Sequence, residues 1–186
     1  MCKKIIIVAG YLAGGKTIFS QKLSEKIKIP CFNKDLMKIE LGKNIEVNNR
    51  EDSKRLSIAT YNIMMHIMEN FMKAGKPLII ESNFDNYSSK IIKQYLEKYG
   101  YKPLTYLLLG DLKILHKRFI ERENSSERDN VNKIFGLLND FLVFEKSVEP
   151  LKDFNVGGEI IRIDTSYFNK VNFDKYIEDA YNFINK

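Results

Sequence analysis

The sequence predicts an α/β protein built on a five-stranded parallel sheet with helices on both faces. Short apolar runs rich in β-branched residues recur along the chain, which is typical of strands buried on both faces. Amphipathic stretches of helical period separate these runs, and this alternation predicts parallel crossovers. Polar residues follow the apolar runs, at the sheet edge where open α/β proteins bind their ligands.

The predicted elements alternate along the whole chain. We expect strands over residues 5–9, 29–33, 78–80, 104–109 and 159–164. We expect helices from about residue 16, over 36–41, 52–73 and 87–99, from about 112, and over 131–146 and 168–184. Gly100 suits a helix C-terminus and Asp111 a helix N-cap. Residues 42–50 are polar, show no clear period and are expected to form a mobile connection.

The segment between the first strand and the first helix has the sequence GYLAGGKT over residues 10–17 and fits the pattern G-x-x-x-x-G-K-T. Its glycines allow backbone conformations in which successive N–H groups point at a polyphosphate. Lys16 is expected to reach the β- and γ-phosphates, and the Thr17 hydroxyl to ligate Mg²⁺. The predicted nucleotide contacts in this region are Gly10, Ala13, Gly14, Gly15, Lys16, Thr17 and Ile18.

This pattern predicts the P-loop fold of nucleoside triphosphate hydrolases, with ATP and Mg²⁺ as cofactors. The alternative is a glycine-rich turn with an incidental lysine. The buried strand before the loop and the amphipathic helix after it favour the phosphate site.

Length and composition are consistent with one domain over residues 1–186. No apolar run approaches the roughly 20 residues of a membrane span, so we expect no membrane partner. The two cysteines have no metal-ligand spacing and suit a reduced, cytoplasmic setting. The net charge of +6 permits a nucleic-acid substrate, but basic residues are interleaved with acidic ones rather than clustered. The sequence carries no signal for an oligomeric state.

Two carboxylates beyond the loop are candidates for chemistry. Asp35 follows the second predicted strand and could accept a proton from an acceptor hydroxyl, an effect worth about 10²–10⁴-fold in rate. Its alternative role is the N-cap of the following helix. Glu81 ends a buried strand, where nucleotide-binding proteins place a carboxylate that orders Mg²⁺. Its alternative role is the polar end of that strand.

Arg118, Arg122 and Arg128 lie on and after a predicted helix. They suit a small lid over about residues 121–131 that closes on the nucleotide and neutralises charge during transfer. The alternative is a solvated face with Arg–Glu pairs, because acidic residues interleave with the arginines. These acidic residues are Glu121, Glu123 and Glu127.

With these residues in place, the chain resembles the small P-loop kinases of the polynucleotide kinase and zeta-toxin type, a group of AAA-type ATP-binding proteins near the chloramphenicol phosphotransferases. The resemblance spans residues 5 to about 130. The matching stretches are the P-loop, FNKDLMK over 32–38, IIESNF over 79–84, and Lys117-Arg118 with Arg122.

The resemblance implies roles for several residues. Asp35 matches the general base, Arg122 or Arg128 the lid arginine on the ATP phosphates, and Lys38 a basic residue that contacts an acceptor phosphate. The chain departs from the pattern at Leu12-Ala13, where Pro-Gly is usual, and at Glu81, where aspartate is usual.

The sequence therefore predicts an ATP- and Mg²⁺-dependent kinase that acts on a hydroxyl acceptor, with Lys16, Asp35 and Arg122 as catalytic residues. A polynucleotide 5′-hydroxyl is one acceptor. The alternatives are a sugar, nucleoside or antibiotic, or a non-catalytic ATP-binding role. Arg50 and Arg55 border the polar 42–50 stretch and are candidates for acceptor contacts. The acceptor residues assigned on this basis are Asp35, Lys38, Arg55 and Asn83.

Overall fold

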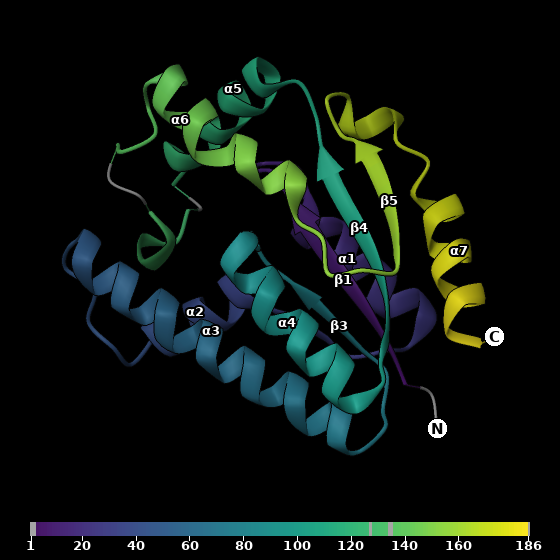
Figure 1. Ribbon diagram of the computed structural model, residues 1–186. Coiled ribbons are helices and arrows are strands. Elements are labelled where there is room, and N and C mark those ends of the chain that lie inside the picture. Colours follow the sequence, from purple (N-terminus) through teal and green to yellow (C-terminus); the bar gives the residue numbers. More distant parts are fainter. Residues whose placement is uncertain (1–2, 127, 134–135, 186) are drawn as a thin grey trace.

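Five parallel strands form a single sheet in the order β2-β3-β1-β4-β5 (Figure 1). The computed structural model describes residues 3–126, 128–133 and 136–185. The strands are β1 Lys4–Gly10, β2 Cys31–Asn33, β3 Leu78–Glu81, β4 Lys102–Leu109 and β5 Glu159–Asp164. All five strands expected from the sequence are confirmed within a few residues.

The central strand β1 is buried on both sides, because residues 5–9 have no exposed surface. It pairs with β3 through Ile5–Leu78 and with β4 over its whole length. Successive side chains of a strand point to opposite faces, so this apolar run needs a layer of helices on each face.

Helices supply those two layers. Figure 1 shows α3 and α4 on one face of the sheet and α1 and α7 on the other. The first core contains methionines of α3 packed on alternate β1 side chains, and the second contains Phe19, Leu23 and Ile177. The helices of the two layers are α1 Lys16–Ile27, α3 Arg50–Lys73, α4 Asn86–Tyr99 and α7 Phe173–Asn185.

A third group of helices lies at the C-terminal edge of the sheet, at the top of Figure 1. Its apolar core includes Phe119, Phe144 and Leu151 and reaches Tyr11 of the first loop. The helices of this group are α5 Leu112–Glu123, η1 Asn130–Asn132, α6 Phe141–Val148 and η2 Glu149–Asp153. The group thus covers the edge of the sheet where the polar residues gather.

Two helix predictions had wrong boundaries. The helix expected over 131–146 begins at Phe141, because Gly136 has a φ of 75° and Asp140 caps the helix by accepting a hydrogen bond from Val143 N. Residues 134 and 135 of that prediction lie outside the described part. The helix expected over 168–184 divides into η3 Phe168–Lys170 and α7. The polar stretch 42–50 contains the end of α2 Lys34–Gly42 and the start of α3.

Within the described residues, no helix has the length and apolar character needed to cross a lipid bilayer.

Candidate active site

The loop between β1 and α1 takes a conformation that depends on its glycines. Gly10 has a φ of 123°, and a Cβ atom there would collide with the carbonyl oxygen of Leu108. Gly15 has a φ of 79°, and a Cβ atom there would collide with the ring of Phe168. Leu108 of β4 and Phe168 of η3 therefore leave no room for a side chain at these two positions. The close packing also constrains the path of the loop.

The start of α1 offers hydrogen-bond donors. Among the described residues, no backbone acceptor is found for the N–H groups of Gly15, Lys16 and Thr17. Gly15 is the N-cap of α1 and supplies no side chain to bond them. Unpaired N–H groups and the positive end of the helix dipole together make an anion site, which fits a phosphate chain.

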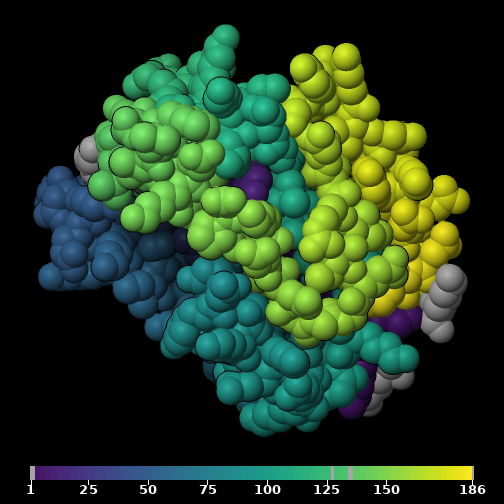
Figure 2. Space-filling view, turned by 45° about the horizontal axis from the view of Figure 1, so that its top comes forward, coloured from purple at the N-terminus to yellow at the C-terminus, as the bar shows by residue number. Residues whose placement is uncertain are grey.

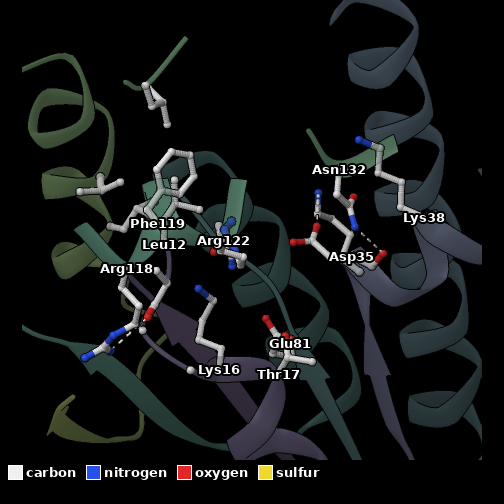
Figure 3. A pocket seen from close by; sticks show the side chains of 18 of the residues that line it. Leu12, Lys16, Thr17, Asp35, Lys38, Glu81, Arg118, Phe119, Arg122 and Asn132 are labelled. Atoms are coloured by element: carbon white, nitrogen blue, oxygen red, sulfur yellow. Dashed lines mark hydrogen bonds and ion pairs between the residues drawn. The ribbon is translucent and has the colours of Figure 1, made fainter. Parts of the chain in front are cut away.

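Lys16 lies buried at the centre of this site (Figure 3). Its ammonium group donates a hydrogen bond of 2.7 Å to the carbonyl oxygen of Tyr11. Burial lowers the pKa of Lys16 to about 8, against the opposing effect of the carboxylates of Glu81 and Asp35. The side chain is therefore a largely buried cation at neutral pH, and its attraction for phosphate oxygens is stronger there than in bulk water.

Thr17, Glu81 and Asn33 form a hydrogen-bonded cluster beside the loop. Thr17 Oγ1 donates to Glu81 Oε2 at 3.2 Å, and Asn33 Nδ2 donates to both of these oxygens. Burial raises the pKa of Glu81, which is 4% exposed, to about 7. These are hard oxygen donors of the kind that Mg²⁺ prefers.

The cluster could bind Mg²⁺ only if a bound phosphate supplies part of the ion's coordination shell. Within the described residues, no group of three or more acidic, histidine or cysteine side chains could hold a metal by itself. Mg²⁺ in such sites takes one or two protein ligands and completes its shell with water and phosphate oxygens. Thr17 and Glu81 would supply the protein part of that shell.

Asp35 lies at the beginning of α2 with 45% of its side chain exposed. It does not cap this helix, because Asn33 Oδ1 is the group that accepts the hydrogen bond from Leu36 N, at 2.9 Å. Burial opposes ionisation of Asp35, but the charges of Lys34, Lys16 and Arg128 lower its pKa below the ordinary value. Asp35 is thus an ionised carboxylate at neutral pH that pairs with Lys34 at 3.4 Å and is not used as a helix cap.

A cavity of about 870 Å³ connects these groups. Its walls include Gly14, Lys16, Thr17, Asp35, Glu81 and Arg122. Figure 3 shows Lys16 and Arg122 between Arg118 and Phe119 on one side and Asp35 and Lys38 on the other. In Figure 2, purple atoms of the N-terminal part are visible at the bottom of a gap beside the green helices.

The three predicted arginines all line this cavity but differ in their contacts. Arg118 donates to the carbonyl oxygens of Ala13, Thr165 and Ser166 at 2.9–3.3 Å and so ties the P-loop to the segment after β5. Arg128 forms an ion pair of 2.7 Å with Glu123. The pair matches the Arg–Glu pairing of the alternative, but its side chains are only 14% and 10% exposed, so it does not form a solvated face.

Arg122 is the arginine whose charge is available to a ligand. Its Nε is buried and has no hydrogen-bond partner in the described part of the chain, and its guanidinium carbon lies 5.6 Å from the centre of the Phe119 ring. A buried N–H without an acceptor is costly. Burial and the nearby charge of Arg128 lower its pKa. A phosphate oxygen in the cavity would satisfy this group.

The predicted acceptor residues are only partly brought together. Asn83 and Lys38 line the cavity with Asp35. Lys38, however, is only 4% exposed and its ammonium group donates to Ser53 Oγ at 2.8 Å and to the carbonyl oxygen of Val131 at 2.5 Å. Arg55 is not among the cavity residues, because it points to solvent and pairs with Glu51 at 3.5 Å.

Of the predicted nucleotide contacts in and after the loop, Gly10 does not line the cavity. Those that do are Ala13, Gly14, Gly15, Lys16, Thr17 and Ile18. Sequence reasoning assigned no role to Asn33, Ser57 or Asn132. Asn33 stands at the end of a predicted strand, which is a signal that could have found it. Ser57 lies within α3 and Asn132 ends η1, and no local pattern marks either residue.

Comparisons with known proteins agree with this description of the fold. No protein-family model matches the chain, and no curated protein matches it in sequence. Among solved structures, a protein of Chloroflexus aurantiacus j-10-fl assigned provisionally as a kinase superposes with a TM-score of 0.87 at 20% identity, over 98% of this chain and 99% of its own.

Two further kinases are similar at lower scores. Shikimate kinase from Bacteroides thetaiotaomicron has a TM-score of 0.60 at 12% identity, over 98% of both chains. A sugar kinase from Janibacter sp. HTCC2649 has a TM-score of 0.58 at 14% identity, over 98% of this chain and 95% of its own. The chain therefore has the fold of the P-loop-type kinases. Its finer grouping with polynucleotide kinases stays a prediction.

Proposed function

We propose that this protein is an ATP-dependent kinase that transfers the γ-phosphoryl group of ATP to a hydroxyl group of a small molecule. One observation carries the proposal: a single cavity holds the P-loop lysine, Lys16, and the ionised carboxylate of Asp35. The first group is suited to a phosphate donor and the second to a hydroxyl acceptor. The kinase names of the similar structures support the same activity.

The donor side of the cavity binds and orients the triphosphate. The N–H groups at the start of α1 and the ammonium of Lys16 bond the phosphate oxygens, with Lys16 leaving the Tyr11 carbonyl for a charged acceptor. Arg122 neutralises charge as the phosphoryl group moves. When bound, Mg²⁺ supplies charge neutralisation between the phosphates, and Thr17 and Glu81 would hold it.

The acceptor side supplies the base. The acceptor oxygen bonds to the γ-phosphorus, the bond from that phosphorus to the β,γ-bridging oxygen breaks, and ADP leaves with the electron pair. The hydroxyl proton passes to the Asp35 carboxylate. The lowered pKa of Asp35 keeps this group ionised before the reaction.

A small acceptor is favoured over a nucleic-acid end. Similar structures with named acceptors include a sugar kinase, a gluconokinase and a shikimate kinase, and these names indicate small polyhydroxylated substrates. Leu36 and Ile39 line the acceptor end of the cavity together with the polar side chains of Ser57 and Asn83, a mixture that suits a small polar molecule.

Transfer from [γ-³²P]ATP tests the proposal. The full chain is incubated with a panel of sugars, sugar acids, nucleosides and aminoglycosides, with a 5′-hydroxyl oligonucleotide included as a separate arm. We expect a labelled small-molecule product. Label on the oligonucleotide alone would restore the polynucleotide acceptor, and ATP binding without transfer to any acceptor would favour a non-catalytic role.

A further inference from the structure

Four cationic side chains lie at the acceptor end of the cavity, near the proposed base Asp35. These are Lys34, Lys38, Arg50 and Arg128, and all four line the cavity. They are close enough to influence one another. After burial, the charge of Lys34 is the largest cause that lowers the pKa of Lys38 to about 8; the Asp35 carboxylate opposes this shift, and Arg50 and Arg128 add to it. Like charges held this close destabilise the fold unless an anion joins them.

Two of the four cations already have an acidic partner. Lys34 lies 3.4 Å from Asp35 Oδ1, and Arg128 lies 2.7 Å from Glu123 Oε1. The charges of these two are therefore compensated within the fold.

Neither of the other two forms an ion pair with an acidic side chain among the residues that the structure describes, although the Asp35 carboxylate is near enough to Lys38 to raise its pKa. Lys38 bonds only the hydroxyl of Ser53 and the carbonyl oxygen of Val131, which are neutral. Arg50 has an exposed side chain and is the first residue of α3, so it stands at the positive end of a 24-residue helix.

Other carboxylates near the cavity do not neutralise the positive charges of Lys38 and Arg50. Asp85 also lines the cavity, but its Oδ1 accepts the N–H and the hydroxyl of Ser88 as the cap of α4. In the first turn of α3, Glu51 pairs with Arg55, and Asp52 accepts a hydrogen bond from Asn48 N. Neither Glu51 nor Asp52 lines the cavity.

Resting on the proposed kinase activity, we propose that the acceptor is an anionic small molecule whose carboxylate or phosphate group binds Arg50, with the charge of Lys38 behind it. The hydroxyl group that receives the phosphoryl group then faces Asp35. Ser57 of α3, which lines the cavity and accepts a hydrogen bond from Lys34, is placed to contact the body of the same ligand. Arg50 is thus a specificity residue for the acceptor.

Equilibrium binding tests this proposal without requiring turnover. The full chain, loaded with Mg²⁺ and a non-hydrolysable ATP analogue, is titrated with matched pairs: D-gluconate against D-glucitol for a carboxylate, and ribose 5-phosphate against ribose for a phosphate. We expect the anionic member of at least one pair to bind roughly tenfold more tightly than its neutral partner. The pair that shows the preference identifies the kind of anion.

Variants of one helix supply the controls. Arg50→Gln should reduce the preference for the anionic ligand to about threefold or less, and Arg50→Lys should keep most of it. Arg55→Gln should leave the preference unchanged, because Arg55 lies five residues along α3 and outside the cavity. The affinity for the ATP analogue should not change in any of them. The proposal would be overturned if both members of each pair bind equally well or if no ligand binds. It would also be overturned if the preference survives Arg50→Gln, or if Arg50→Gln weakens nucleotide binding as much as it weakens binding of the anion.

The parallel transfer assay separates this proposal from the kinase activity on which it rests. An Arg50-dependent preference for the anion without phosphoryl transfer would reject the kinase alone. Transfer with no such preference would reject the anionic acceptor alone.

Discussion

The ammonium group of Lys16 donates a hydrogen bond of 2.7 Å to the carbonyl oxygen of Tyr11, so this lysine is folded back on its own loop. Phosphate oxygens are charged acceptors and bind an ammonium group more strongly than a neutral carbonyl does. We therefore expect Lys16→Ala to reduce phosphoryl transfer by roughly 10²-fold or more.

The same substitution should not reduce stability much, because Lys16 is buried against a neutral oxygen and its burial is costly. Urea unfolding beside the transfer assay measures both effects. Lys22→Ala, an exposed position on the same helix, is the matched control. Turnover retained in Lys16→Ala, or a large loss of stability, contradicts this role.

Glu81 predicts a dependence of stability on pH. Burial raises its pKa from 4.5 to about 7, so the folded state holds a proton that the unfolded state has already released. The stability that this carboxyl contributes is complete below about pH 4.5 and is lost as the pH rises to about 7. Unfolding free energies measured across this range should show that loss in the wild type and a smaller one in Glu81→Gln.

Mg²⁺ affinity should also depend on the ionisation of Glu81, but it should increase with pH, whereas the stability contribution of Glu81 decreases. A metal needs the ionised carboxylate, so Mg²⁺·nucleotide affinity is expected to rise as the pH approaches about 7. Glu81→Gln should weaken the Mg²⁺ affinity and flatten its pH profile. A variant with the wild-type profile would show that Glu81 does not take part in metal binding.

Ala13 has a φ of 57°, a left-handed conformation that costs a residue with a side chain about 1–2 kcal/mol. Glycine is usual here in the kinases that the sequence resembles. We expect Ala13→Gly to stabilise the protein by about 1 kcal/mol, measured by urea unfolding. Lys28, which has a φ of 58° at the end of α1, provides a control of the same conformation outside the cavity, and Lys28→Gly should show a similar gain. A loss of stability in Ala13→Gly would mean that packing contacts of the Ala13 methyl group stabilise the protein by more than the left-handed conformation costs.

Arg122 has a buried Nε–H group without a hydrogen-bond partner in the described residues. We expect Arg122→Gln to lower the rate of transfer by roughly 10²-fold while the unfolding free energy stays the same or increases. Lys113→Gln, on an exposed face of the same helix, should change neither quantity. Rates and unfolding curves for the two variants form the comparison, and a fully active Arg122→Gln protein would remove the arginine from the mechanism.

Local patterns were sufficient to predict the sheet and one edge of the site. Residues 5–9 are apolar and β-branched because they are buried on both faces, and this property is visible in the sequence. Lys16 was found from the G-x-x-x-x-G-K-T pattern. Asp35 and Glu81 were found because the ends of parallel strands meet at one edge, a rule that needs no knowledge of contacts.

The remaining contacts depend on distant parts of the chain. Arg118 bonds the carbonyl oxygen of Ala13, 105 residues away, and Lys38 bonds that of Val131, 93 residues away. Arg118 was predicted to contact phosphates from its charge and spacing, and Lys38 from the resemblance to known kinases. The helix boundary at Phe141 was missed for a similar reason, since the apolar residues before it match a helical period although Gly136 and Asp140 end the pattern.

The most direct test of the account is single-turnover phosphoryl transfer by Asp35→Asn, measured beside the wild type and Glu40→Gln, an exposed position on the same helix. The account predicts unchanged ATP affinity and a transfer rate reduced by about 10²-fold or more in Asp35→Asn, with wild-type behaviour in Glu40→Gln. Near-normal transfer by Asp35→Asn would contradict it.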